Sequence, residues 1–417
     1  MVPHPHSYEA STSSREPNAR KASVQSLPKP PSTFTCRGGR RYHGDEAIHY
    51  FLPCDVQELS RQSLFHEVQR EVYGGYHCAE FPDDGIPNKV LEVGCGTAIW
   101  SASVADSFAS RGRPDVQFVG LDIVPVYPDM HGVNFTFVQH NFQNLPLPFP
   151  DGEFDYVICR EVSMVTPVSD VYGSQIADCV RVLKPGGTLE LQCFTDARET
   201  SADYSIRSLQ RTAAPFTPGS SAYTIASATQ FSLSAENPFV TAWNERITRA
   251  LTKYQLSPVP CTLAGPQLLM EEGLTGVQAK RMALPLDEIW WESPTNFEDP
   301  RRKRTSMEST STVDSKNRKN SLSVHRRSST SVGSNQSQSL KSPLSGEEKA
   351  VRELARLTFA QLIESLEPIL RETNSIAMDD WDRWYKDMMV NFFQHGGLQG
   401  GECVEFGSWW GQKAPKE

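Results

Sequence analysis

The sequence lacks several features that would assign it to a membrane, secreted or zinc-binding class. No run of apolar residues approaches the length of about 18 that a membrane span needs, so no membrane partner is expected. The first residues, MVPHPHSYEASTSS, contain no apolar stretch of the kind found in secretory signals. The nine cysteines are scattered singly without a CxxC pair, which favours reduced thiols over a metal site. We therefore expect a cytoplasmic protein without a bound metal.

Positive charge is scarce outside one segment. The net charge is −9, but residues 301–345 alone hold ten Lys or Arg and two Asp or Glu, a local charge of +8. The rest of the chain therefore carries −17, which disfavours a nucleic-acid partner. Within the basic segment, the run RRKR at 301–304 is typical of a nuclear localisation signal, and serines beside arginines suit basic-directed kinases. A solvated linker is the alternative interpretation of the same residues.

Composition divides the chain into four parts. Residues 1–38 are rich in Ser, Pro and charge, which predicts a disordered tail. Residues 39–290 hold the main domain, beginning with a cap helix. Residues 297–345 are serine-rich, basic and of low complexity, which predicts a disordered insertion. Residues 346–417 supply further helices and a last strand, which we expect to complete the main domain.

Apolar runs alternate with amphipathic stretches from residue 89 onward. The runs predict strands at 89–93, 116–123, 134–140, 154–160, 188–194, 275–286 and 402–411. Helices are expected at 98–111 and 170–183, and KPGG at 184–187 is expected to form a turn. This order predicts an α/β fold with a doubly wound, mainly parallel, seven-stranded sheet and helices on both faces.

The other predicted helices flank this alternation. Residues 52–75 form the cap helix, with Asp55 as N-cap and with Leu59, Leu64, Val68 and Val72 on its apolar face. Further helices are expected at 239–256, 264–273 and 377–394. Ser345 and Glu348 predict a capping box for a helix that starts near 347 and ends or kinks at Pro368.

The stretch VLEVGCGTAIW at 90–100 places a Gly-x-Gly turn directly after a strand. Such a turn lets backbone N–H groups approach a ligand closely. The dinucleotide fingerprint needs a third glycine at position 99, which is Ile99, and no Gly-Lys-Ser/Thr follows. A nicotinamide-dependent oxidoreductase is therefore a less favoured alternative. Asp122, which ends the next strand, suits the two hydroxyls of a ribose, so a nucleoside cofactor such as S-adenosylmethionine fits best.

Four segments together resemble the class I, Rossmann-type S-adenosylmethionine-dependent methyltransferases. They are VLEVGCGTAIW (90–100), FVGLDI (118–123), LPLPFPDGEFDYV (145–157) and RVLKPGGTLEL (181–191), in the order and with the spacing of the family. The turn GCGT-x-IW and the upstream Leu52-Pro53-Cys54-Asp55 resemble fungal members related to the velvet-complex regulators of secondary metabolism. The resemblance implies a methyltransferase that binds S-adenosyl-L-methionine at the carboxyl ends of the first four strands.

The same resemblance implies roles for individual residues. Glu92 orients the loop and meets the amino group of the cofactor, Asp122 holds the ribose, and Phe142 covers the adenine. The adenine amino group is met by Asn141, or by Gln143 if the register shifts. The implied cofactor-binding set is Glu92, Gly94, Cys95, Gly96, Thr97, Ala98, Asp122, Ile123, Asn141, Phe142 and Arg160.

Three questions stay open at this level. The resemblance implies that Arg160 and Glu161, the candidate catalytic residues, face the methyl group and the substrate. Glu161 is either a general base or the partner of a salt bridge to Arg160 or a helix cap. Ala98 replaces a usual glycine, at a cost of about 1 kcal/mol if its φ is positive. The acceptor is expected to be a small or medium-sized metabolite; a regulatory or scaffold protein with protein partners and little turnover is the alternative function.

Overall fold

The computed structural model describes residues 34–45, 48, 50–165, 171–195, 206–210, 220–226, 230–231, 235–257, 260–292 and 344–415. Residues 1–33 of the predicted tail lie outside this part. So does nearly all of the predicted insertion, with its basic run and kinase sites. The tail, the insertion, the nuclear signal and the cellular location therefore stay predictions.

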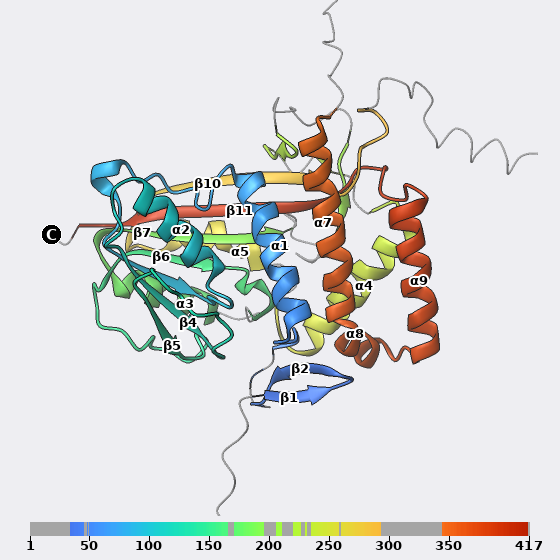
Figure 1. The fold of residues 1–417 in the computed structure, drawn as a ribbon, viewed down its shortest axis with the longest axis horizontal. Coiled ribbons are helices and arrows are strands. Elements are labelled where there is room, and N and C mark those ends of the chain that lie inside the picture. Colours follow the sequence, from blue (N-terminus) through green and yellow to red (C-terminus); the bar gives the residue numbers. More distant parts are fainter. Residues whose placement is uncertain are drawn as a thin grey trace, which may run out of the picture.

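One mixed sheet forms the centre of the molecule (Figure 1). Its long strands, in spatial order, are β5 (Phe135–Gln139), β4 (Gln117–Asp122), β3 (Lys89–Val93), β6 (Phe154–Arg160), β7 (Leu183–Thr195), β11 (Glu402–Lys413) and β10 (Leu274–Pro285). The first five are parallel, and β11 is antiparallel to both of its neighbours. Two-residue strands β8 (Arg207–Ser208) and β9 (Tyr223–Thr224) pair with β11 and β10 and extend the sheet to nine strands. The predicted α/β class with seven main strands is confirmed.

The predicted KPGG turn lies inside β7 and does not precede it. Phe154 of β6 pairs with Leu183 of β7, and Tyr156 of β6 pairs with Thr188 of β7. The two pairs are two residues apart on β6 but five apart on β7, so β7 contains extra residues between them. Gly186 has a φ of +78°, in the region that favours glycine. The four residues form an irregularity in the strand, because the chain on both sides of them already pairs with the sheet.

Helices cover both faces of the parallel half of the sheet. On one face, α2 (Ile99–Ser110) packs Trp100 and Phe108 against apolar residues of β3, β4 and β6. On the other face, α3 (Val171–Val182) and α5 (Pro260–Met270) pack against β3, β6 and β7. Strands covered on both faces read as continuous apolar runs, which explains why the sequence predicted them well.

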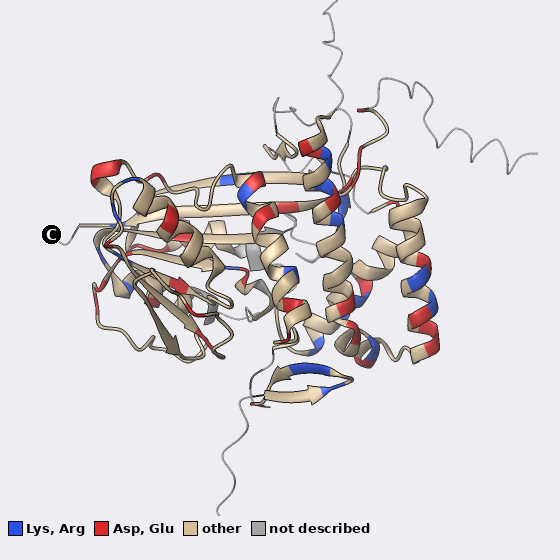
Figure 2. Ribbon diagram, in the orientation of Figure 1, with Lys and Arg blue, Asp and Glu red and all other residues tan. Residues whose placement is uncertain are grey.

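A second layer of helices packs against the β10–β11 end of the sheet. It consists of α1 (Val56–Tyr73), α4 (Pro238–Lys253), α7 (Gly346–Ser365), α8 (Glu367–Asn374) and α9 (Met378–Gln394). Figure 1 shows α1 and α7 side by side. The outer face of α9 carries charges of both signs (Figure 2), whereas its Trp381 and Met388 are buried in the core.

The predicted helix ends are largely confirmed. Asp55 caps α1 by accepting from the N–H of Glu58, and Ser345 and Glu348 form the complete capping box of α7. α7 ends at Ser365, and Pro368 lies in the first turn of α8. The hairpin of β1 (Phe34–Arg37) and β2 (Arg40–His43) was not predicted, because β1 falls in the segment assigned to the tail.

A buried carboxylate ties this arrangement together. Glu190, on β7, is fully buried and accepts five hydrogen bonds of 2.8–3.0 Å. The donors are the main-chain N–H groups of Cys78 and Ala79 and the side chains of Tyr156, Gln192 and Ser408. The segment that follows α1 is thereby attached to β6, β7 and β11.

The cysteines depart from expectation at one position. Seven are free thiols, but Cys193 on β7 is disulfide-bonded, so the prediction of reduced thiols is wrong for this residue. Within the described part of the chain, no three His, Cys, Asp or Glu side chains are grouped as metal ligands. No helix in that part has the length and apolar character needed to cross a membrane.

The turn between β3 and α2 contains Ala98 in a left-handed conformation. Ala98 is the N-cap of α2, with φ 55° and ψ 21°, and is fully buried. Its side chain contributes no capping hydrogen bond. The methyl group therefore strains the backbone by about 1 kcal/mol where glycine would not.

Replacing Ala98 by glycine should therefore stabilise the protein. We expect Ala98→Gly to raise the free energy of unfolding by about 1 kcal/mol, measured by urea denaturation. Ala102→Gly, inside α2, is the matched control and should lower it by a similar amount, because glycine weakens a helix interior. Destabilisation by both substitutions would contradict the assignment of strain to Ala98.

Candidate functional site

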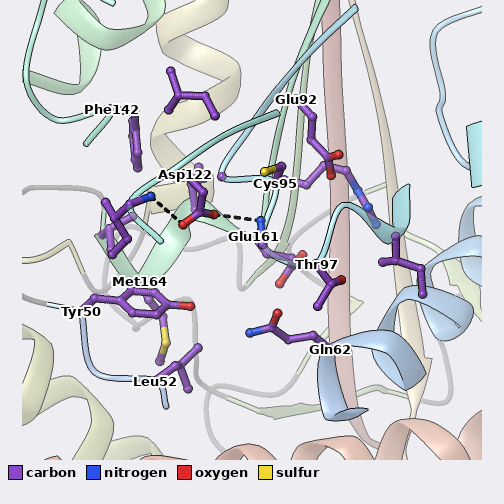
Figure 3. Close-up of a pocket in the computed structure, with 18 of the residues that line it drawn as sticks. Tyr50, Leu52, Gln62, Glu92, Cys95, Thr97, Asp122, Phe142, Glu161 and Met164 are labelled. Carbon is purple, nitrogen blue, oxygen red and sulfur yellow. Dashed lines mark hydrogen bonds between the residues drawn. The ribbon is translucent and has the colours of Figure 1, made fainter. Parts of the chain in front are cut away.

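A pocket opens at the carboxyl ends of β3, β4 and β6, where the order of the strands reverses. Open α/β sheets bind ligands at such a point. All residues of the predicted site line this pocket except Ala98. α1 forms the opposite wall, with Tyr50 and Leu52 also lining the pocket (Figure 3). Leu362 of α7 is a further lining residue. The predicted site residues, Ala98 excepted, thus lie together around one pocket, and their role in binding stays a prediction.

The two glycines of the loop are required by its geometry. Gly94 has φ +72° and Gly96 has φ +49°, a conformation that other residues rarely adopt. A Cβ atom at Gly94 would lie 2.9 Å from Cγ1 of Val162. A Cβ atom at Gly96 would lie 3.4 Å from Oε1 of Gln62 on α1. A ligand in the pocket can thus lie directly against the backbone of this loop.

Asp122 is fixed at the end of β4 with its carboxylate in the pocket. The carboxylate accepts from the N–H groups of Gly96 at 2.8 Å and Ile123 at 2.7 Å, and from that of Val124 at 3.4 Å (Figure 3). Burial raises the pKa of Asp122, while these N–H groups act to lower it. Oδ1 accepts from both Ile123 and Val124, so Oδ2, which accepts from Gly96 alone, is the oxygen that keeps a lone pair for a ligand.

Glu92 lies deeper, behind the loop. Its side chain is buried and accepts from the hydroxyl of Ser101 at 2.6 Å. Burial raises the pKa of Glu92 to about 7, against the lowering effect of nearby Arg160 and of Ser101. Glu92 therefore connects β3 to the first turn of α2 and borders the pocket at the same time.

Arg160 and Glu161 are joined through one amide and not to each other. Arg160 Nη2 donates to Oε1 of Gln69 at 2.6 Å, and Gln69 Nε2 donates to Oε1 of Glu161 at 2.6 Å. Arg160 Nε also donates to Gln192 at 3.0 Å. A salt bridge between Arg160 and Glu161, one of the predicted alternatives, is not formed. Burial lowers the pKa of Arg160 and raises that of Glu161 to about 7.

His66 on α1 is held as a neutral imidazole. Ser103 donates its hydroxyl proton to the carbonyl of Ile99, so it accepts from Nε2 of His66 at 3.2 Å. Nδ1 then carries a lone pair, and it lies 3.5 Å from Nη1 of Arg160. Burial, assisted by Arg160 and Arg70, lowers the pKa of His66 to about 3.

Asn141, Phe142 and Gln143 line the far side of the pocket. Oδ1 of Asn141 accepts from the N–H of Gln143 at 3.0 Å, and the Gln143 amide donates to the carbonyl of Val165. The choice between Asn141 and Gln143 as partner of an adenine group stays a prediction, since both side chains border the same space.

The sequence missed the residues that α1 contributes. Arg61, Gln62, Phe65, His66 and Gln69 all line the pocket. The predicted apolar face was partly wrong, because Leu64 is exposed. The sequence did offer one signal: these residues, four polar and one aromatic, recur at the i, i+3, i+4 spacing of one helix face. Such a mostly polar face is normally interpreted as exposed to solvent, so without knowledge of the pocket opposite it does not indicate a binding site.

Comparison with known proteins identifies the domain. Residues 90–187 match the family model described as a methyltransferase domain. The "Secondary metabolism regulator laeA" of Aspergillus fumisynnematus is 36% identical over 113 residues, 26% of this chain and 28% of that protein. The "Protein-methionine methyltransferase laeA" of Emericella nidulans is 38% identical over 106 residues, 25% of this chain and 26% of that protein.

A third relative matches over a longer segment. The "Methyltransferase pytC" of Aspergillus terreus is 29% identical over 172 residues, 41% of this chain and 50% of that protein. The matched segments thus span between about a quarter and a half of these relatives. The family model covers the cofactor side of the pocket from β3 to the start of β7, and it confirms the predicted resemblance. The segment from β3 to the start of β7 is thus a class I S-adenosylmethionine-dependent methyltransferase domain, similar in sequence to that segment of the fungal laeA proteins.

Proposed function

We propose that the protein binds S-adenosylmethionine in this pocket and transfers its methyl group to an acceptor that lies between the strand ends and α1. The observation that carries the proposal is the fixed Asp122 carboxylate beside the open backbone of Gly94 and Gly96, in a domain of this family. When bound, the cofactor supplies a methyl group already activated by a sulfonium centre.

The residues present fit this cofactor. Oδ2 of Asp122 offers a free lone pair to a ribose hydroxyl, and Ile123 and Phe142 offer apolar surface to a purine. The glycines leave room for the ligand against the loop, which a side chain would fill. Positioning of the acceptor in line with the methyl group then supplies much of the rate.

The acceptor side supports a small or medium-sized molecule with an apolar body. Leu52, Phe65 and Met164 line this part of the pocket and belong to a hydrophobic core. The polar groups there are few and fixed, which is typical of sites that recognise one orientation of a ligand. Function within this fold is set by such added surfaces and not by the fold itself.

The alternative function is that of a regulator with little turnover. The strain at Ala98 supports it, as do relatives whose names describe regulators of secondary metabolism. A large gain in cofactor affinity in Ala98→Gly would favour this alternative. The nicotinamide oxidoreductase is disfavoured by Ile99, which stands where the dinucleotide fingerprint needs glycine.

Removing the Asp122 carboxylate should weaken cofactor binding. Hydrogen bonds to a charged group contribute about 1.5–3 kcal/mol, so we expect Asp122→Ala to raise the Kd for S-adenosylmethionine by about 10-fold or more. Titration calorimetry measures it. Asp122→Asn, which keeps the side-chain volume, should also bind more weakly.

Asp115→Ala provides the matched control, because Asp115 is exposed and lies just before the other end of β4. Its affinity should equal that of the wild type. Equal affinities in the Asp122 and Asp115 variants would contradict the ribose assignment. A folded wild type that does not bind the cofactor would contradict the proposed function as a whole.

A second acceptor is supported by one side chain of the protein. Met164 lines the pocket beside Tyr50 and Leu52 (Figure 3), and a thioether sulfur accepts a methyl group without losing a proton. The laeA protein of Emericella nidulans is named as a protein-methionine methyltransferase. Methylation of Met164 is therefore the second candidate function.

Mass spectrometry tests this candidate. After incubation with S-adenosylmethionine, we expect the peptide that contains Met164 to gain the mass of one methyl group. Met164→Leu should abolish the gain, whereas Met388→Leu, a buried methionine of α9 outside the pocket, should keep it. A gain on other peptides only would exclude Met164 as the acceptor.

A further inference from the structure

Glu161 occupies a backbone conformation that its residue type does not favour. Its φ is +54°, and its N–H donates to the carbonyl of Gln192 at 3.2 Å, which fixes it at the end of β6. The strain is about 1 kcal/mol or more, and a glycine would not have it. Among the described non-glycine residues with positive φ, Glu161 is the one that lines the pocket. Since glycine would avoid the strain, we ask what the glutamate side chain does in the pocket.

The Gln69 amide determines what the Glu161 carboxylate can do. Arg160 only donates, so the oxygen of the buried Gln69 must face Arg160 and its NH2 group must face Glu161. Glu161 thus receives a neutral donor in place of a guanidinium. Among the described residues, no ion pair to Glu161 forms, and its Oε2 has no hydrogen-bond donor.

The other two carboxylates among the described lining residues are held on the sheet side of the pocket. Asp122 binds three main-chain N–H groups, and Glu92 is buried behind the loop with Ser101. His66 has its lone pair directed at Arg160. Glu161, which accepts from Gln69 of α1, is therefore the carboxylate that faces the α1 side with an oxygen free to meet an acceptor molecule.

The groups around Glu161 set its charge balance. Three side chains of α1 face Glu161: Arg61, His66 and Gln69. Arg160 precedes it on β6, and Asp122 lines the same pocket from the end of β4. Arg61 is already paired with Glu58 at 2.7 Å, and His66 is neutral. Burial raises the pKa of Glu161 to about 7, against Arg160, Arg61 and the Gln69 hydrogen bond. This range suits the removal of a weakly acidic proton.

We propose that Glu161 accepts the proton of a neutral, hydroxyl-bearing acceptor with an apolar skeleton, such as a phenol or an enol, and that Gln69 is its positioning residue. The inference rests on the proposed methyltransferase function and names its substrate class. Leu52, Phe65 and Met164 supply apolar surface for the skeleton. A protic oxygen is favoured over an amine cation, because an amine cation has no lone pair with which to attack.

The step balances without a further reactant. A lone pair of the acceptor oxygen forms the bond to the methyl carbon, and the electrons of the breaking carbon–sulfur bond stay on sulfur. The hydroxyl proton moves to Oε2 of Glu161. The products are a methyl ether and S-adenosylhomocysteine, and Glu161 then releases the proton to water.

The first test uses binding alone, with 2-naphthol as the probe. This phenol becomes a strong acid when excited, so its emission colour reports whether a proton acceptor lies within hydrogen-bond reach. In the wild-type protein, bound 2-naphthol should emit from its anion, and in Glu161→Gln from its neutral form. Glu67→Gln, on the outer side of α1, is the matched control and should resemble the wild type. Identical emission in all three proteins would overturn the proposal.

The second test compares a protic with an aprotic acceptor. With labelled S-adenosylmethionine, Glu161→Gln should transfer methyl groups to 2-naphthol about 100-fold more slowly than the wild type. With methyl 2-naphthyl sulfide, which has no proton to lose, the two should differ by less than about 3-fold, since general-base assistance is then absent. Equal losses with both acceptors, or a wild type that binds the cofactor but does not methylate 2-naphthol, would overturn the proposal.

The pH dependence tests the role of Gln69. The wild-type rate with 2-naphthol should fall as the pH drops below about 7, because Glu161 is then protonated and does not accept. Gln69→Leu removes a hydrogen bond that stabilises the charged form, so the midpoint should move to higher pH. A lower rate with an unchanged midpoint would assign Gln69 a structural role only. Failure of the wild type to bind S-adenosylmethionine would instead reject the proposed function.

Discussion

The arrangement of the site depends on a carboxylate buried in the core. A charged group in a protein interior is very costly unless its hydrogen bonds are complete, and Glu190 has five donors. Because two of them are the N–H groups of Cys78 and Ala79, the chain that leaves α1 is fixed to the sheet. At the other end of α1, buried Glu58 binds Arg61 and accepts from Ser365 of α7 at 2.7 Å. α1 is thereby held over the strand ends.

Fixing α1 gives the pocket two walls of different character. The sheet wall is built from backbone turns and from Asp122, which suits the binding of an invariant cofactor. The α1 wall is built from side chains, of which His66 and Gln69 are linked to Arg160 and Glu161 at the end of β6. A change of one side chain in such a linked set alters the partners of the next, so we propose that this wall selects the acceptor.

The sequence predicted the sheet wall because its signals are local. A Gly-x-Gly turn after one strand and an acidic residue at the end of the next predict a binding site by themselves, whatever the rest of the chain packs against them. The α1 wall lacks such a signal, since Gln62 and Gln69 differ from exposed glutamines only through what lies opposite. The backbone angle of Ala98 could not be predicted for a similar reason. The sequence shows that the residue is alanine, but its positive φ is determined by the turn in which it lies. The hairpin of β1 and β2 was missed because eight residues rich in arginine resemble a tail.

The position of β11 has a consequence for synthesis of the protein. β11 pairs with β7 on one side and β10 on the other, and Lys413 near its end donates to the carbonyls of Arg181 and Leu183 at 3.0 and 2.6 Å. A nascent chain therefore carries two bare strand edges, on β7 and β10, until residues 402–413 have been synthesised. Bare edges pair readily with other chains. Residues 402–413 cover both edges at once when they join the sheet.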